Sequence, residues 1–172
     1  MPRSKVPHDE VDVIVEIPQG SRNKYEYDER TGRFRLDRVL FASVHYPTEY
    51  GFIPETRAPD GDPLDALVIT HEPTFTGCVI PARPVGLFDM RDEKGIDQKI
   101  LAVPVGDPRF DEVRDIGDLA PHWLREIENF FATYKTLEGK VTQVVGWENA
   151  TSAWDLIRRS RTAFRTAKGG AA

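Results

Sequence analysis

Residues 59–69, PDGDPLDALVI, join an acidic turn to a buried strand. The first half holds three carboxylates in six residues, together with the glycine and prolines that form turns. From Ala66 onward the segment is a short continuous apolar run, as expected of a strand buried on both faces. Asp65 therefore lies where the chain enters the core, and a carboxylate there needs a cation, several donors or a metal ion as its partner.

The acidic turn alone leaves three interpretations open: a solvated turn, a cation site, or one half of a structural salt bridge. A calcium-binding loop is a further alternative, because DGDPLD begins like the loop of an EF-hand. Its sixth position would then require Gly but is Asp65, its twelfth would require Glu but is His71, and Pro63 interrupts the loop. The residues therefore disfavour an EF-hand.

The composition is that of a mildly acidic protein with one core. With 172 residues, 40% of them hydrophobic, we expect a single domain over residues 1–172. The net charge of −5 argues against a nucleic-acid partner held by counterion release. Cys78 is the single cysteine, so no disulfide can form within the chain, and a buried thiol in a reducing compartment is expected. Without a secretory signal or a long apolar run, the sequence predicts a cytoplasmic protein with no membrane partner.

The order of the apolar patterns predicts an α+β fold. Strands are expected at residues 11–17, 25–27, 33–36, 66–69, 77–80, 82–88, 99–105 and 141–145, with residues 90–97 as a polar connection. From Trp123 the apolar residues, including Leu137, recur at intervals of three and four, which predicts a helix that ends near Gly139. A second helix is expected at residues 150–165, followed by a frayed tail at 168–172. We therefore expect a closed or nearly closed β-core with the helices packed outside it.

A second acidic cluster lies between two predicted strands, in residues 92–99, DEKGIDQK. Asp97 and Lys99 share one strand face through their spacing of two, and Asp92 can fold back across the turn. By itself this segment is an ordinary hydrophilic hairpin. Because both acidic clusters occupy the ends of apolar strands, we expect a rigid barrel to bring them to one site.

Cations and phenols complement these carboxylates. They are Lys24, Arg38, Tyr46, Tyr50, Tyr134 and Lys135. Each alone has an ordinary explanation as a solvated or packed side chain. Together, carboxylates suit Mg²⁺ while Lys, Arg and Tyr suit phosphate oxygens. Because the carboxylates would repel a bare polyphosphate, a divalent metal ion is needed between the two charges.

Several separated segments are similar to one known family. PDGDPLDAL resembles the signature of the family I soluble inorganic pyrophosphatases, and the chain length resembles their prokaryotic type. The further similar segments are IVEIPQGSRNKYEYD, LDRVLFASVHYPTEYGFIPET, RPVGLFDMRDEKGIDQKILAVP, HWLREIENFFATYKTLEGK and VVGWENA. This resemblance covers residues 11–165. It implies a five-stranded barrel of the oligonucleotide-binding (OB) type, flanked by two main helices, that hydrolyses pyrophosphate to two orthophosphates with several Mg²⁺ ions, for which Mn²⁺ or Zn²⁺ can substitute.

The resemblance also implies roles for the matching residues. The metal ligands would be Asp60, Asp65, Asp92, Asp97, Glu16 and Glu26. The substrate would be bound by Lys24, Glu26, Arg38, Tyr46, Tyr50, Lys99, Tyr134 and Lys135, with Glu93 in the polar shell. In the catalytic step Asp62 would act as general base toward a metal-activated water, together with Lys24, Arg38 and Tyr50. Gln143 stands where some bacterial members have Lys, and the prokaryotic type implies a homohexamer.

Two non-catalytic alternatives stay open at this point: an OB-type barrel that binds nucleic acid, and a calcium-binding barrel. The net charge of −5 argues against the nucleic-acid-binding barrel, although a fold does not by itself decide a function. A zinc site is disfavoured because the four histidines have no paired spacing, although His45 is next to Tyr46 and near the expected pocket. The histidines are His8, His45, His71 and His122.

Overall fold

The computed structural model describes residues 10–170. Five strands form a closed ring, because β6 pairs with β1 as well as with β7. In order around the ring they are β1 (Val11–Ile17), β4 (Glu49–Ile53), β5 (Leu64–Val68), β7 (Gly95–Pro104) and β6 (Val79–Asp92). Only β5 and β7 run parallel within this ring, and β8 (Gln143–Asn149) extends the sheet beside β6. The expected closed five-stranded barrel is confirmed.

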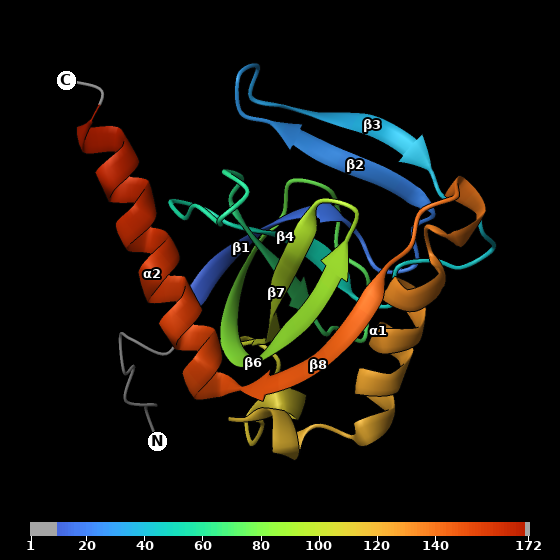
Figure 1. Cartoon of the computed structure of the whole chain (residues 1–172). Helices are drawn as coiled ribbons and strands as arrows, with labels where there is room; N and C mark the ends of the chain where they lie inside the picture. Colours follow the sequence, from blue (N-terminus) through green and yellow to red (C-terminus); the bar gives the residue numbers. More distant parts are fainter. Residues whose placement is uncertain (1–9, 171–172) are drawn as a thin grey trace.

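A two-stranded hairpin lies outside this ring. Its strands, β2 (Asn23–Asp28) and β3 (Arg33–Val39), pair with each other and form a separate sheet. Figure 1 shows the hairpin, in lighter blue, standing beside one end of the barrel. The turn contains Gly32 at a positive φ of 66°, as expected for a glycine in a left-handed turn position.

Two helices cover the barrel on opposite sides (Figure 1). Helix α1 (Pro121–Thr133) starts with a proline, which suits the first turn because its missing N–H would have no helical partner. Helix α2 (Ala150–Gly169) is capped by Asn149, whose side chain accepts a hydrogen bond from the Ser152 N–H at 3.1 Å. No helix among residues 10–170 is both long and apolar enough to cross a membrane.

Three short 3₁₀ helices connect these elements. They are η1 (Pro108–Phe110), η2 (Ile116–Asp118) and η3 (Thr136–Glu138). The last follows α1 directly and ends at Gly139, which has a positive φ of 73° and turns the chain back toward β8.

The core explains why the strands lie where they do. β1 alternates buried and partly exposed residues, whereas β5 buries Ala66, Leu67 and Val68 in succession, as the continuous apolar run predicted. One core cluster packs the barrel against α1 through Phe130 and Phe131, and the other packs it against α2. In β4, a Cβ on Gly51 would lie 2.0 Å from the Ile14 carbonyl oxygen, so this close pairing with β1 requires glycine.

Several predicted boundaries are wrong. Residues 90–97 are not a connection, because β6 continues to Asp92 and β7 begins at Gly95 after a tight turn. β4 was not predicted, and the two strands expected at 77–80 and 82–88 are one strand, β6, which begins at Val79. Helix α1 ends at Thr133, which leaves Leu137 67% exposed and off the apolar face. Cross-strand hydrogen bonds with neighbours distant in sequence decide these lengths, and a local pattern does not contain them.

Two further differences concern the C-terminal region and Cys78. The late strand is shifted to residues 143–149, and α2 continues to Gly169, so Lys168 belongs to a helix and not to a tail. Cys78 is only partly buried. His8 and the last two residues of the predicted tail lie outside the described residues.

Candidate active site

The acidic side of the candidate site is built from barrel strands. Asp65 is on β5 and Asp97 on β7, two strands that pair directly. Asp60 belongs to the turn before β5, where its Oδ1 accepts a hydrogen bond from the Asp62 N–H at 3.0 Å. Asp60, Asp65 and Asp97 line one small cavity, and Asp62 and Asp65 line a neighbouring cleft of about 500 Å³. The predicted convergence of the two acidic clusters is confirmed.

Lys99 lies between the two strand-borne carboxylates. Its Nζ donates to Asp65 Oδ2, Asp97 Oδ1 and the Tyr50 hydroxyl, each at 3.0 Å, and its side chain is 2% exposed. Burial alone would lower the pKa of Lys99, yet Asp65, Tyr50 and Asp97 together raise it well above its usual value. Lys99 is therefore a fixed positive charge at the floor of the site.

The carboxylates are a suitable donor set for a hard divalent cation. Burial, followed by the like charges of Asp60 and Asp65, raises the pKa of Asp62 above its ordinary value, which shows that these carboxylates repel one another. In residues 10–170 no three His, Cys, Asp or Glu side chains stand in a metal-holding arrangement, and Asp65 and Asp97 are turned toward Lys99. Oxygen donors that repel each other fit a cation chemically, and binding one would require side-chain rotations.

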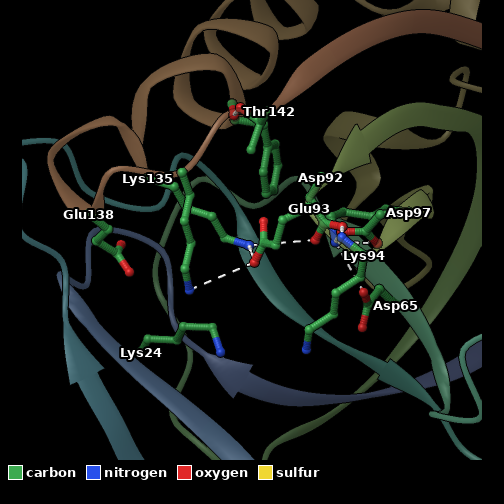
Figure 2. A network of polar contacts seen from close by, with 12 residues as sticks. Lys24, Asp65, Asp92, Glu93, Lys94, Asp97, Lys135, Glu138 and Thr142 are labelled. Atoms are coloured by element: carbon green, nitrogen blue, oxygen red, sulfur yellow. Dashed lines mark hydrogen bonds and ion pairs between the residues drawn. The ribbon is translucent and has the colours of Figure 1, made fainter.

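A second acidic group lies at the tight turn between β6 and β7. Asp92 Oδ2 and Glu93 Oε1 are each 3.5 Å from Lys135 Nζ, and Lys140 Nζ is 3.7 Å from Glu93 Oε1. Lys135 follows α1, so the loop after α1 lies against the β6–β7 turn. Figure 2 shows Asp92 and Glu93 between Lys135 and Asp97, with the Lys94 side chain extending between Lys24 and Asp65 in this view. The fold thus brings together Asp92 and Glu93 of the β6–β7 turn and Lys135 of the loop after α1.

The hairpin supplies two more cations. Lys24 on β2 pairs with Glu26 and lies 3.2 Å from Asp37 Oδ2, and Arg38 Nη1 lies 2.7 Å from that same oxygen. Although burial opposes this effect, Lys24 and Arg38 hold the pKa of Asp37 below its ordinary value. Asp37 therefore holds the two phosphate-binding cations that were predicted on the hairpin, Lys24 and Arg38.

Glu16 occupies the wall between the hairpin and the barrel. It lines the 500 Å³ cleft with Lys24 and Asp65, and its Oε2 accepts a hydrogen bond from the Tyr27 N–H at 2.8 Å. Burial is the main cause that raises the pKa of Glu16 to about 7, with further contributions from nearby carboxylates such as Asp65. The Glu16 carboxyl therefore takes up a proton at a higher pH than an exposed glutamate does.

The three predicted tyrosines pack side by side. The Tyr46 ring is 5.5 Å from Tyr50 and 4.6 Å from Phe130, and Tyr134 stacks on Phe130 at 5.1 Å. Burial raises the pKa of all three phenols, so their hydroxyls stay neutral and able to donate. Tyr46 packs against Tyr50, whose hydroxyl accepts a hydrogen bond from Lys99, and Tyr134 packs against Phe131, whose ring centroid is 5.4 Å from Lys99 Nζ.

Two residues of this site were not predicted from the sequence. Asp37 precedes Arg38 and holds it, and Glu138 Oε1 lies 2.8 Å from Arg38 Nε. The available signals were the position of Asp37 next to Arg38 and that of Glu138 three residues after Lys135. His45 and Gln143 are exposed, and no described contact ties either to the site.

Taken together, the site brings carboxylates, cations and neutral phenols into one region beside the cleft, and each of these cations is paired with at least one carboxylate. Such an arrangement can bind divalent cations and phosphate oxygens at the same time. Asp62, exposed and with a raised pKa, has the properties of a group that accepts a proton.

Comparisons with known proteins agree with this chemistry. The family model described as inorganic pyrophosphatase matches residues 13–165. An inorganic pyrophosphatase of Methanosarcina acetivorans is 53% identical to this chain, over 88% of this chain and 90% of its own length. An inorganic pyrophosphatase of Nostoc sp. is 52% identical, over 90% of this chain and 92% of its own length. The crystal structure of inorganic pyrophosphatase from Thermus thermophilus superposes with a TM-score of 0.90 at 43% identity, covering 96% of this chain and 97% of the other. The five-stranded ring is thus an OB-type barrel, and the chain belongs to the inorganic pyrophosphatase family of hydrolases.

Proposed function

We propose that the protein hydrolyses inorganic pyrophosphate to two orthophosphates in a reaction that requires Mg²⁺. The observation that carries this proposal is the shared cavity of Asp60, Asp65 and Asp97, which adjoins a cleft lined by Lys24. Asp65 lines both spaces, so a cation held there would lie beside an anion in the cleft. A site for the anion alone would not need this many carboxylates.

In this proposal, aspartates of the two acidic clusters bind the divalent ions. Asp60, Asp65 and Asp97 would hold one divalent ion, and Asp92 with Asp97 would hold an ion that arrives with the substrate. Glu16 and Glu26 complete the acidic wall of the cleft. When bound, these ions would neutralise phosphate oxygens and lower the pKa of the attacking water. Mn²⁺ or Zn²⁺ can take the place of Mg²⁺ in the proposal, since both accept oxygen ligands.

The protein groups act on the proton and on the phosphates. Asp62 takes a proton from the attacking water as its oxygen bonds to one phosphorus, and the bond from that phosphorus to the bridging oxygen breaks. Lys24, Arg38 and Lys135 bind the phosphate oxygens and stabilise the charge that develops on the leaving phosphate. Tyr46, Tyr50 and Tyr134, kept neutral by burial, are suited to donate hydrogen bonds to the same oxygens, and Lys99 adds its fixed positive charge.

Release of phosphate from pyrophosphate tests the proposal. We expect turnover with Mg²⁺, none in EDTA, and a fall in kcat of about 10²- to 10⁴-fold in Asp62→Asn, because a general base is lost. Asp12→Asn, an exposed aspartate on β1, is the matched control and should retain wild-type turnover. Wild-type protein that releases no phosphate at saturating Mg²⁺ would refute the proposal. Salt-sensitive retention of oligonucleotides, or calcium binding without turnover, would then favour the two binding alternatives.

We also infer a homohexamer in the cytoplasm, on the resemblance to the prokaryotic type. Several large apolar side chains support self-association because they are exposed, among them Phe41 at 61% and Phe75 at 67%. Light scattering measures this directly, and a monomer at micromolar concentration would contradict it.

A further inference from the structure

The ion pair between Glu138 and Arg38 joins two parts of the site that are otherwise built independently. Arg38 is on β3 of the hairpin, whereas Glu138 ends η3, three residues after Lys135. Within residues 10–170, the other described ion pairs of the hairpin stay inside it: Lys24–Glu26, Lys24–Asp37, Arg30–Asp28 and Arg38–Asp37. Glu138 thus provides the one described ion pair from the hairpin to another element.

Glu138 is buried enough for this contact to matter. Its side chain is 6% exposed and that of Arg38 is 23% exposed, so the pair is screened by water much less than a surface pair. Glu138 Oε2 is buried and has no hydrogen-bond partner among the described residues. A buried carboxylate in this state depends on the Arg38 charge for its compensation.

Glu138 and Asp37 face different nitrogens of the Arg38 guanidinium. Glu138 Oε1 faces Nε at 2.8 Å, and Asp37 Oδ2 faces Nη1 at 2.7 Å. The Nε–H group makes no well-directed hydrogen bond, so the contact is mainly electrostatic. These two carboxylates occupy the Nε and Nη1 positions and leave Nη2 and the second Nη1 hydrogen for an incoming oxyanion.

The second partner of this contact is the loop that carries Tyr134 and Lys135. Figure 2 shows Glu138 and Lys135 on this same loop, with Lys24 on the hairpin opposite. If the contact is lost, Arg38 is tied only to Asp37, its neighbour in sequence, and moves with the hairpin. Its distance from the phosphate groups bound by Lys135 is then no longer fixed.

We propose that Glu138 is a positioning residue for pyrophosphate hydrolysis, which holds the Arg38 guanidinium in place relative to the loop that carries Lys135. The inference rests on the proposed function and adds to it a residue that does not touch the substrate. Glu138 acts through Arg38, so removing the Glu138 carboxylate should matter only while Arg38 is present.

A double-mutant cycle tests this inference. We expect Glu138→Gln to lower kcat/KM about tenfold, and Arg38→Lys, which keeps the charge but loses the planar fork, to lower it more. In the Arg38→Lys background, Glu138→Gln should change kcat/KM by less than about twofold. Glu148→Gln, an exposed glutamate on β8, serves as the control and should match wild type in both backgrounds.

The remaining outcomes also decide the matter. Effects of Glu138→Gln and Arg38→Lys that multiply would overturn the positioning role, because they would show that Glu138 acts independently of Arg38. If Glu138→Gln unfolds, the same cycle with Glu138→Asp applies, since that variant keeps the charge and shortens the reach. Binding of the slowly hydrolysed analogue imidodiphosphate should weaken in the same non-additive pattern. An inactive wild-type protein would instead refute the proposed function.

Discussion

The barrel and the hairpin contribute different groups to the site and hold them in different ways. The barrel presents Asp65 and Asp97 on paired strands, where Asp65 lies between the buried Leu64 and Ala66 and Asp97 lies two residues before the buried Lys99. The hairpin presents Lys24 and Arg38 on a two-stranded sheet outside the ring, where most side chains are partly or fully exposed. Carboxylates that must share a cation need the fixed spacing of a core, whereas groups that bind a passing anion can sit on an element held by a few contacts.

Replacing Lys99 with Met would have the largest effect on the barrel side. Removing the charge leaves Asp65 and Asp97 facing each other without their shared cation, so we expect a loss of about 3 kcal/mol of unfolding free energy in EDTA. Mg²⁺ should recover part of that loss by binding the two freed carboxylates. Urea unfolding with and without Mg²⁺ measures both effects, and equal stability of the variant and wild type in EDTA would contradict the assigned role of Lys99.

Hydrogen exchange compares the two regions within one molecule. We expect the β2 and β3 amides to exchange through local opening that costs about 2 kcal/mol less than opening of β5 and β7. The reason is that the hairpin buries few apolar side chains, whereas β5 lies in the core. Mass spectrometry of the peptides measures this difference, and equal protection of the hairpin and the barrel would remove the contrast.

Arg57→Leu tests how firmly the acidic turn is attached to the barrel. Arg57 Nη1 donates to the Gly61 carbonyl at 2.6 Å, and its backbone N–H donates to the Ser160 carbonyl of α2 at 2.9 Å. The variant keeps the backbone bond and loses the side-chain bond, so we expect about 1.5 kcal/mol less stability and several-fold weaker Mg²⁺ binding. Titration calorimetry with Mg²⁺ measures the affinity, and an unchanged affinity would show that the turn does not need this brace.

Glu49→Gln gives the smallest expected effect. Glu49 is fully buried at the start of β4, accepts a hydrogen bond from the Thr74 N–H at 2.5 Å, and has its pKa raised, chiefly by burial. A carboxyl with a raised pKa in the folded state contributes stability below its unfolded pKa, and this contribution is lost as the pH rises through the folded pKa. Stability of the variant relative to wild type should therefore rise by about 1 kcal/mol from pH 4 to neutral pH, and a flat difference would contradict the burial argument.

The barrel side of this contrast was the easier to predict. Asp65 stands next to a continuous apolar run, and Asp97 and Lys99 share a strand face, so local patterns locate both. The β4 strand was missed because Gly51 looks like a turn residue, although its pairing with β1 needs a glycine. The role of Glu138 depends on a contact across a hundred residues of chain, and no local pattern indicates it. The assignment of roles to the cations came from resemblance and not from periodicity.

The position of Lys99 has a consequence for the life of the protein before it meets a metal. Because its ammonium group already pairs with Asp65 and Asp97, the newly made chain contains an internal counter-ion, and we expect it to complete its barrel in a magnesium-poor solution. Metal binding would then rearrange a few side chains in a protein that is already folded. Removing the metal with a chelator should therefore abolish activity reversibly without unfolding the protein.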